Sequence, residues 1–234
     1  MNLLEASRKF PIENFIYASS SSVYGGNKRL PFHESDNVDK PISLYAATKK
    51  SNELMAHSYS HLYDIPSIGL RFFTVYGPWG RPDMAPFIFA NSISKRKPIN
   101  IFNYGNMKRD FTYISDIVES ITRCCFKPVT KNDLSNSGQF NKVISSAPHK
   151  IFNVGNNKSI KLTDFISVLE KELNISAIKN FVDMQPGDVK ETESDSGELY
   201  DWIRFKPLVT INEGVPKFIK WFKKVAIGKK YINV

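Results

Sequence analysis

Short apolar runs alternate along the chain with longer stretches in which apolar residues recur at helical spacing. The run at 15–18 ends in four serines, and a second run covers 68–73, as buried parallel strands do. Between them, Ser43 can cap a helix over 44–63. The apolar residues that predict one buried stripe along this helix are Leu44, Ala47, Leu54 and Leu62.

The rest of the chain repeats this alternation. Helices are expected over 2–9, 84–96, 163–173 and 212–224, with strands over 99–102 and in the segment KIFNVGN at 150–156. Ser115 is expected to cap a further helix, with Asp116 and Glu119 in its first turn. Strands that alternate with helices predict an α/β fold with a parallel sheet.

Composition narrows the class of protein. Of the 234 residues, 41% are hydrophobic and 24% are charged, which is ordinary for a soluble globular chain. The apolar runs are too short to span a bilayer, and the first residues do not resemble a signal peptide. Cys124 and Cys125 are adjacent and cannot staple the fold, which favours a reducing, cytoplasmic setting. We therefore expect no membrane partner.

The net charge of +9 raises the question of nucleic-acid binding. The excess lies in short, separated clusters such as Lys95-Arg96-Lys97, without a basic tail or zinc-finger spacing. Attraction to a small anionic substrate fits this distribution better, so no nucleic-acid partner is expected.

Tyr45 and Lys49 are the first candidates for chemistry. They lie four residues apart on the expected helix, so they share a face, and a nearby ammonium favours the phenolate form of a tyrosine. Tyr45 would then act as a general base. The pair alone is weak evidence, because the same spacing is common by chance. His57 and His61 also have metal-ligand spacing, but no third ligand follows, so no metal site is expected.

Several segments together carry a more specific signal. They are YASSSSVYG, SLYAATKKSNELMAHSYSHLY, GLRFFTVYGPWGRPDM, YGNMKRDFTYISDI, IFNVGN and QPGDV. With them the chain resembles the extended short-chain dehydrogenase/reductase family of NAD-dependent sugar-nucleotide epimerases and dehydratases. Within that family it is most similar to the UDP-glucuronate 4-epimerase branch, and the resemblance covers nearly the whole chain.

The resemblance implies roles for particular residues. Tyr45 would take the proton from the sugar 4-hydroxyl, and Lys49 would assist it and hold the nicotinamide ribose. Ser20 and Ser22 would donate hydrogen bonds to the 4-oxygen. Related dehydratases carry acidic residues where this chain has Ser21 and Ser22, so epimerisation is expected and dehydration is not.

Cofactor and substrate contacts follow from the same resemblance. NAD would be held by Tyr45 and Lys49, together with Ser19 and Phe72. The residues expected to contact the UDP-sugar are Thr74, Arg81, Arg109, Gln185 and Asp188. A guanidinium at Arg81 suits the substrate carboxylate through paired hydrogen bonds, and Arg109 would bind the diphosphate. The alternatives are an ordinary surface arginine at 81 and a turn residue at Asp188.

The family's glycine-rich phosphate-binding turn is not found, since neither GxGxxG nor GxxGxxG occurs in the sequence. The expected fold is an incomplete Rossmann-type parallel sheet, without its first strands, and a smaller α/β substrate-binding region. The partial dinucleotide-binding domain would comprise 1–78, with 110–126 and 150–156 returning to it. The ranges 79–109 and 157–234 would form the substrate region, and 127–149 a mobile excursion.

The sequence thus predicts the C-terminal portion of an NAD-dependent UDP-sugar 4-epimerase, an isomerase that converts UDP-glucuronate to UDP-galacturonate. Without the glycine-rich segment, the chain alone is expected to have little or no activity, and its NAD binding is doubtful. The alternatives are another UDP-hexose epimerase and a non-catalytic remnant that binds only UDP-sugar. A homodimer through the helix at 44–63 is also expected from the resemblance.

Overall fold

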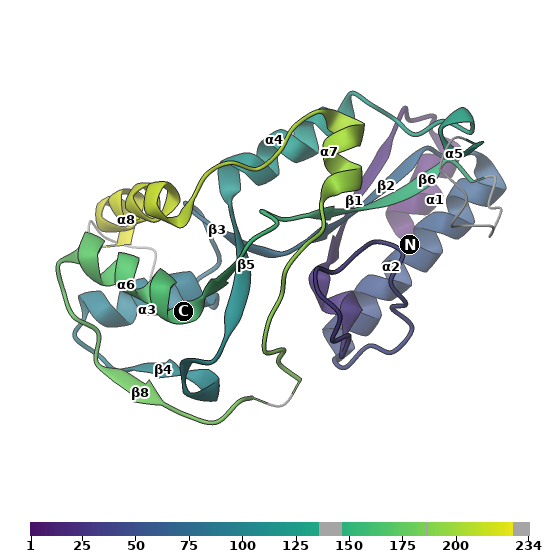
Figure 1. Ribbon diagram of the computed structural model, residues 1–234. Coiled ribbons are helices and arrows are strands. Elements are labelled where there is room, and N and C mark those ends of the chain that lie inside the picture. Colours follow the sequence, from purple (N-terminus) through teal and green to yellow (C-terminus); the bar gives the residue numbers. More distant parts are fainter. Residues whose placement is uncertain (136–146, 186, 227–234) are drawn as a thin grey trace. The chain divides into compact units, whose positions relative to one another are not determined.

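The computed structural model describes residues 1–135, 147–185 and 187–226 (Figure 1). They form two compact units, each assembled from three stretches of the chain. The first unit comprises 1–73, 118–154 and 194–205. The second comprises 74–117, 155–193 and 206 onward. The chain is therefore α/β in class, as expected, and each unit has secondary structure of both kinds.

A parallel sheet organises the first unit. Its strands β1 (Phe15–Ser20), β2 (Ser67–Phe72) and β6 (His149–Val154) lie side by side in the order β1-β2-β6 (Figure 1). The register pairs Ser20 with Phe72, so the serines end β1 at the carboxyl edge of the sheet. Among the described residues β1 pairs only with β2, so its other edge has no strand beside it.

Helix α2 (Leu44–Tyr63) packs against all three of these strands. Its first turn is capped by Ser43, whose Oγ accepts a hydrogen bond from the Ala46 N–H at 3.1 Å. It ends at Asp64, which adopts a left-handed conformation with φ of 54°. Both ends of the expected helix are confirmed.

The buried face of α2 differs from the expected leucine stripe. Leu44, Leu54 and Leu62 are 83%, 57% and 67% exposed. The residues that face the sheet are Ala46, Glu53, Ala56 and Ser60. Small side chains allow the helix to approach the strands closely, and Glu53 is buried because it has charged and hydroxyl partners there. The predicted stripe is therefore wrong.

Short helices complete the first unit. Helix α1 (Asn2–Lys9) contacts α2, and α7 (Gly197–Ile203) packs on β6 through Phe152 and Trp202. The 3-10 helix η1 (Ser21–Tyr24) follows β1 directly. The remaining helices are α4 (Ile114–Cys125), which starts in the second unit and ends in the first, and α5 (Asn132–Ser135).

The second unit holds two small sheets. Strands β3 (Thr74–Tyr76) and β5 (Lys108–Tyr113) are parallel, and β7 (Ser159–Lys161) joins β5 in the antiparallel direction. Strands β4 (Ile99–Ile101) and β8 (Lys179–Phe181) form a parallel pair. The 3-10 helix η2 (Phe102–Gly105) follows β4. The antiparallel strand β7 is an element that the sequence pattern does not predict.

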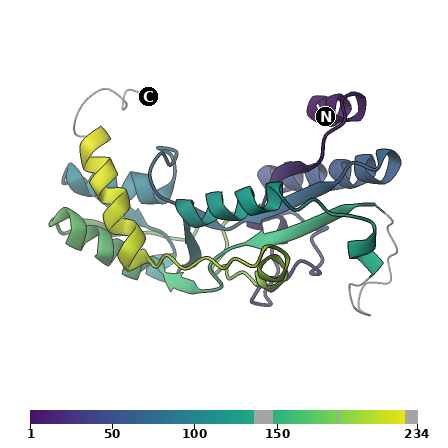
Figure 2. The same cartoon turned by 90° about the horizontal axis from the view of Figure 1, so that it is seen from above.

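Three helices cover the core of this unit. They are α3 (Ala85–Ser94), α6 (Leu162–Leu173) and α8 (Ile211–Ala226), of which α6 and α8 lie side by side (Figures 1 and 2). Phe165, with no exposed surface, stacks on Phe111 at a centroid distance of 4.3 Å. Gly214 in α8 lies against Tyr76, where any side chain would collide with the ring. The core is therefore aromatic and closely packed.

One expected helix cap is not formed. Helix α4 already begins at Ile114, so Ser115 lies inside its first turn. Asp116 uses Oδ2 to accept the backbone N–H groups of Leu208 and Val209, each at 2.9 Å. The carboxylate therefore ties the chain before α8 to the start of α4.

The predicted domain ranges remain predictions, and residues 136–146 of the expected excursion at 127–149 lie outside the described residues. Within the described part of the chain, no helix combines the length and the hydropathy that a bilayer crossing requires.

Candidate functional site

The four serines after β1 form a defined structure. Ser20 ends the strand and caps η1, its Oγ accepting the Ser22 N–H at 3.1 Å. The same hydroxyl donates a hydrogen bond to Ser22 Oγ, also at 3.1 Å. The structure thus brings together the two hydroxyls that the sequence singles out. Ser19 and Ser20 are buried, while Ser21 and Ser22 are partly exposed.

Tyr45 and Lys49 lie one turn apart at the start of α2. Lys49 Nζ is 5.7 Å from the centre of the Tyr45 ring and donates a hydrogen bond to the Ala18 carbonyl at 2.9 Å. This bond ties the lysine to β1 two residues before Ser20. Tyr45 as a whole residue is 53% exposed. The phenol and the ammonium therefore belong to α2, and the serine hydroxyls to β1 and η1, with Lys49 joining α2 to β1.

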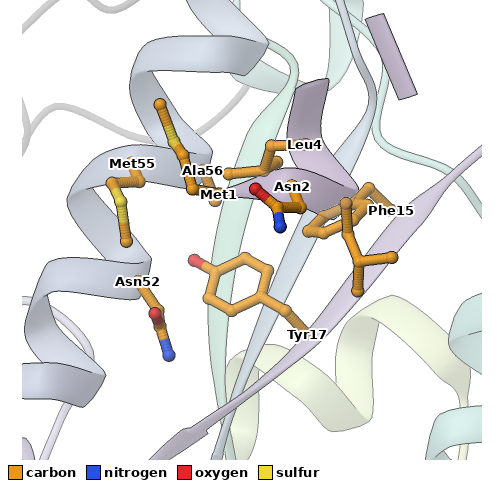
Figure 3. Close-up of a pocket in the computed structure, with 9 residues that line it drawn as sticks. Met1, Asn2, Leu4, Phe15, Tyr17, Asn52, Met55 and Ala56 are labelled. Atoms are coloured by element: carbon orange, nitrogen blue, oxygen red, sulfur yellow. The ribbon is translucent and has the colours of Figure 1, made fainter. Parts of the chain in front are cut away.

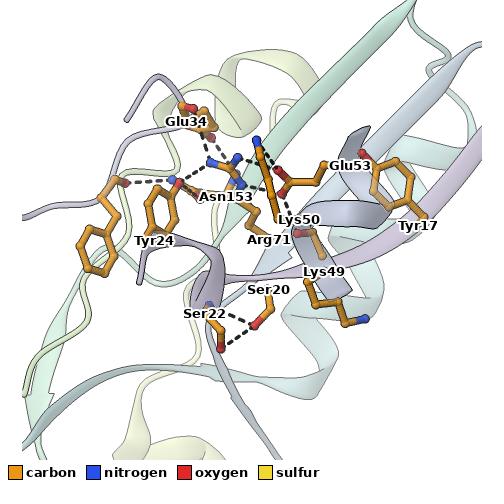
Figure 4. Close-up of polar contacts among 12 residues, drawn as sticks. Tyr17, Ser20, Ser22, Tyr24, Glu34, Lys49, Lys50, Glu53, Arg71 and Asn153 are labelled. Carbon is orange, nitrogen blue, oxygen red and sulfur yellow. Dashed lines mark hydrogen bonds and ion pairs between the residues drawn. The ribbon is translucent and has the colours of Figure 1, made fainter. Parts of the chain in front are cut away.

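A buried ion pair lies behind these groups (Figure 4). Arg71 in β2 donates two hydrogen bonds to Glu53 in α2, from Nε to Oε1 at 2.8 Å and from Nη2 to Oε2 at 2.9 Å. Ser19 donates to the same Oε1 at 2.6 Å. Burial by itself raises the pKa of Glu53, but the hydrogen bonds and charge of Arg71 outweigh it and leave the pKa below its usual value.

The network continues from Arg71 toward β6 (Figure 4). Arg71 Nη1 donates to the Tyr24 hydroxyl at 3.0 Å, and this hydroxyl donates to Asn153 Oδ1 at 2.6 Å. The backbone N–H of Asn153 donates to Glu34 Oε1 at 2.7 Å. Burial raises the pKa of Glu34 to about 7, although the Asn153 hydrogen bond partly offsets this. Asn153 therefore connects the polar network to a loop carboxyl.

Sequence reasoning missed this network. Its charged members are Glu53 and Arg71, and its neutral members include Tyr24 and Asn153. One signal was available, because Arg71 interrupts the apolar run 68–73, where a buried arginine requires an acidic partner. The identity of that partner depends on how α2 packs on the sheet.

The two residues expected to contact NAD besides Tyr45 and Lys49 lie at the carboxyl end of the sheet. Ser19 is 3% exposed, and its hydroxyl is engaged by Glu53. Phe72 ends β2 and is partly exposed. Their cofactor contacts remain predictions.

A second group of expected residues lies in the second unit. Arg109 in β5 pairs with Asp188 at 2.7 Å, and Asp188 also accepts the Val189 N–H. Arg109 is 15% exposed, and burial lowers its pKa while Asp188 counteracts that effect. Gln185 is exposed, and its carbonyl accepts the Asp188 N–H at 3.2 Å. The structure thus brings together Arg109, Asp188 and the Gln185 backbone.

The loop after β3 carries Arg81 and follows Thr74, the partly exposed first residue of that strand. Arg81 is 71% exposed and pairs with Asp83 at 3.2 Å. It also contacts Met84 Sδ at 3.4 Å. Trp79 in the same loop has φ of 63°, a conformation that is unusual for a bulky residue. The guanidinium is therefore open to an anionic ligand that can displace Asp83.

The His57 ring on α2 meets the His149 ring edge-on, with 5.4 Å between their centres. Elsewhere, the ligand atoms of His33, Glu34 and Glu198 lie within 4.8 Å of one another, a grouping that the sequence did not suggest.

A cavity of about 480 Å³ lies beside β1 (Figure 3). Its lining includes Leu4, Phe15, Tyr17, Asn52 and Met55, from α1, β1 and α2. The Tyr17 hydroxyl is 2.8 Å from His149 Nε2, and burial raises the pKa of Tyr17. None of the expected site residues lines this cavity, so the candidate chemistry lies elsewhere on the sheet.

Comparison with known proteins gives the chain a family. Residues 1–155 match the NAD dependent epimerase/dehydratase family. Protein CapI of Staphylococcus aureus is 55% identical, over 95% of this chain and 66% of its own length. A probable UDP-glucuronate 4-epimerase of Rhizobium meliloti is 45% identical, over 94% of this chain and 65% of its own length.

A solved structure agrees with these matches. The UDP-glucuronic acid 4-epimerase of Bacillus cereus, in complex with UDP-glucuronic acid and NAD, superposes with a TM-score of 0.80 at 32% identity. The match covers 95% of this chain and 65% of that chain. The chain thus spans about two thirds of the length of these relatives. It belongs to the NAD dependent epimerase/dehydratase family.

Proposed function

We propose that this chain carries the catalytic and UDP-sugar-binding residues of a UDP-glucuronate 4-epimerase, an isomerase that forms UDP-galacturonate. The observation that carries the proposal is the contact between Tyr45 and Lys49. Lys49 also donates a hydrogen bond to Ala18, in the strand that ends at Ser20. The names of the Rhizobium meliloti and Bacillus cereus relatives support this choice of substrate.

In the proposed reaction, Tyr45 removes the proton from the sugar 4-hydroxyl as a general base, aided by the Lys49 ammonium. Ser20 and Ser22 donate hydrogen bonds to the 4-oxygen as negative charge develops there. At the later reduction Tyr45 returns the proton to that oxygen. The serines at 21 and 22 lack the acidic group that dehydration would need, which supports epimerisation.

NAD, when bound, would accept the C4 hydride and return it to the opposite face of the sugar. The Tyr45 phenol and the adjacent Lys49 ammonium fit the hydroxyls of a nicotinamide ribose. Ser19 and Phe72, at the same edge of the sheet, are the further proposed contacts. Neither GxGxxG nor GxxGxxG occurs in the sequence, so the residues proposed here contact the nicotinamide end of NAD and not its pyrophosphate.

Substrate recognition would belong to the second unit. Arg109 would bind the diphosphate, and Asp188 and Gln185 would contact the ribose and phosphate region. Arg81 would release its ion pair with Asp83 and bind the sugar carboxylate instead. Thr74, seven residues before Arg81, would be a further contact. Planar carboxylate recognition by a guanidinium supports glucuronate over a neutral hexose, for which a UDP-hexose epimerase is the alternative.

The first test is binding and turnover by the purified chain. NAD and UDP-glucuronate are titrated separately by calorimetry, and UDP-galacturonate formation is measured with NAD present. Turnover is measured for the chain alone and after co-expression with the part of the Staphylococcus aureus relative outside the match. UDP-galacturonate formation in either preparation supports the proposal. Failure to bind UDP-glucuronate in both preparations contradicts it.

A UDP-sugar-binding role without turnover is the second candidate. The Arg109–Asp188 pair favours it, because it forms within a unit that holds none of the proposed cofactor residues. UDP-glucuronate binding without turnover in either preparation would establish this role instead of the first.

Replacing Arg81 with Ala tests the carboxylate assignment. Loss of a charge-assisted, paired hydrogen bond should weaken UDP-glucuronate binding roughly 10- to 100-fold and leave UDP-glucose binding nearly unchanged. Arg204→Ala is the matched control, since Arg204 is 74% exposed and pairs with Asp201 at 3.2 Å, much as Arg81 pairs with Asp83. Equal loss for both sugars would remove Arg81 from carboxylate recognition.

A further inference from the structure

The segment that carries Ser20 and Ser22 is fastened at both of its ends. On one side Ser19 donates its hydroxyl hydrogen to Glu53 Oε1 at 2.6 Å. On the other side the Tyr24 hydroxyl accepts from Arg71 Nη1 at 3.0 Å and donates to Asn153. Ser19 and Tyr24 are only 3% and 2% exposed, so water does not compete for these bonds. The two serine hydroxyls thus lie between two anchors.

The two anchor residues, Ser19 and Tyr24, bind the two members of one ion pair, Glu53 and Arg71. Glu53 and Arg71 are each 2% exposed and bind each other through two hydrogen bonds (Figure 4). Arg71 also lies over the Tyr24 ring, 4.9 Å from its centre. The pair therefore connects the start and the end of the serine segment through a single rigid contact.

The same ion pair reaches the helix that carries the tyrosine. Glu53 lies one turn beyond Lys49 on α2, so the two side chains share a helix face. Lys49 fastens that face to the Ala18 carbonyl, and Glu53 fastens it to Ser19. Ala18 and Ser19, which are consecutive in β1, are thus bound by residues on consecutive turns of α2. These two bonds hold α2 against the end of the strand.

The contribution of the buried Glu53–Arg71 pair to the free energy of unfolding does not by itself explain why the pair is present. A buried ion pair often contributes no more than well-packed apolar residues of the same volume, because both charges must leave water. A fully hydrogen-bonded buried network does, however, restrict its members to one geometry. Proton transfer requires such restriction, since reacting groups must be held to within about 0.5 Å of the productive arrangement.

We propose that Glu53 and Arg71 are positioning residues that hold Ser20, Ser22 and Tyr45 in one fixed geometry. Ser19 and Tyr24 transmit this restraint to the serine segment. The inference rests on the proposed function, because it assigns the restraint to the chemistry at the sugar 4-oxygen.

The test removes each anchor with the least change in shape. Ser19→Ala removes the hydroxyl that binds Glu53, and Tyr24→Phe removes the hydroxyl between Arg71 and Asn153. Ser60→Ala is the matched control on α2. Ser60 has no exposed surface, and its Oγ has no hydrogen-bond partner among the residues that the structure describes. Thermal unfolding of all three variants verifies that each is folded.

The first readout needs no turnover. The amides of Ser22, Gly25 and Asn27 donate hydrogen bonds within or next to the serine segment, so their hydrogen exchange reports its restraint. In the 234-residue chain, Ser19→Ala and Tyr24→Phe should each speed exchange over residues 20–27 roughly 10-fold. Ser60→Ala should stay within about 2-fold of the wild type. Unchanged exchange in both anchor variants overturns the proposal.

The second readout separates positioning from simple destabilisation. In the preparation that turns over UDP-glucuronate, Tyr24→Phe, at a residue with no proposed ligand contact, should lower kcat roughly 10- to 100-fold while KM stays within about 3-fold. Unchanged kcat, or a KM that rises as kcat falls, overturns the proposal. If the wild type shows no turnover in any preparation, the proposed function fails. The exchange arm then still decides whether the ion pair restrains the serines.

Discussion

Glu34 has one carboxylate oxygen bonded to the Asn153 N–H and another, Oε2, that is buried without a hydrogen-bond partner among the described residues. Burial raises its pKa from 4.5 to about 7. The folded protein therefore holds a proton on Glu34 between these values, whereas the unfolded chain does not. Stability from this group is complete below pH 4.5 and is lost as the pH rises toward 7.

Replacing Glu34 with Gln should remove this dependence. A shift of that size corresponds to a few kcal/mol at most, so relative to the wild type the variant should gain on the order of 2–3 kcal/mol in unfolding free energy between pH 4.5 and 8. Urea unfolding at several pH values measures it. Glu13→Gln, at an exposed carboxyl of the same unit, is the control. A constant difference between variant and wild type across this range would show that folding does not raise the pKa of Glu34.

At the scale of single residues, the sequence predicts contacts between residues that are close together in the chain. The Ser43 cap and the Tyr45–Lys49 spacing both follow from positions three or four residues apart, and both are observed. The Glu53–Arg71 pair joins residues 18 apart on different elements. Its formation depends on the packing of a helix on a sheet, which local spacing does not encode.

Helix α2 shows how far pattern reasoning reaches for a whole element. Its bounds follow from a cap and an apolar repeat, but its inward face cannot be chosen from hydrophobicity alone, because small and charged residues face the sheet. Strands β3, β7 and β8 have only three residues each, too few to show a period of two. Helix α7 also went unpredicted.

The outward leucines of α2 give a prediction for this element. Because Leu54 is 57% exposed, Leu54→Glu should change the unfolding free energy by less than about 0.5 kcal/mol. Leu70→Ala, at a position with no exposed surface, should cost about 2–5 kcal/mol. Denaturant unfolding of both variants compares them at a concentration low enough to keep the wild type monomeric. A large loss in Leu54→Glu under these conditions would mean that Leu54 packs within the chain itself.

We further propose that this face of α2 pairs with a second copy of the chain. The double variant Leu54→Glu, Leu62→Glu should then sediment as a monomer at concentrations where the wild type sediments as a dimer. The added charges would lie opposite each other across the paired helices. A double variant that still sediments as a dimer would place the contact elsewhere.

At the scale of the molecule, the proposed roles divide between the two units. The first unit holds every proposed catalytic and cofactor residue, whereas the second holds every proposed substrate residue. The resemblance to a family suggests this division for all of these residues except Thr74, which the predicted ranges place in the cofactor domain at 1–78. Composition supplies the net charge of +9 but does not locate the site that uses it.

UDP should therefore bind to the second unit and change amide exchange only there. Bound through Arg109, it should slow amide exchange over 108–113 and 187–193, leave 15–27 unchanged, and bind more weakly as salt rises. Arg109→Ala should abolish the protection. Lys179→Ala, which breaks the ion pair with Glu170 in the same unit, is the control. Protection confined to the first unit would contradict the assignment.

The interleaving of the two units has a consequence for synthesis on the ribosome. The chain passes between them after residues 73, 117, 154, 193 and 205, so neither unit is continuous in sequence. The first unit lacks α7 until residue 203 has left the exit tunnel, and the second lacks α8 until the last turns emerge. Neither unit can finish folding while the nascent chain is short. We expect the two units to complete folding almost together, after residue 203 has emerged, and no single break in the sequence separates them.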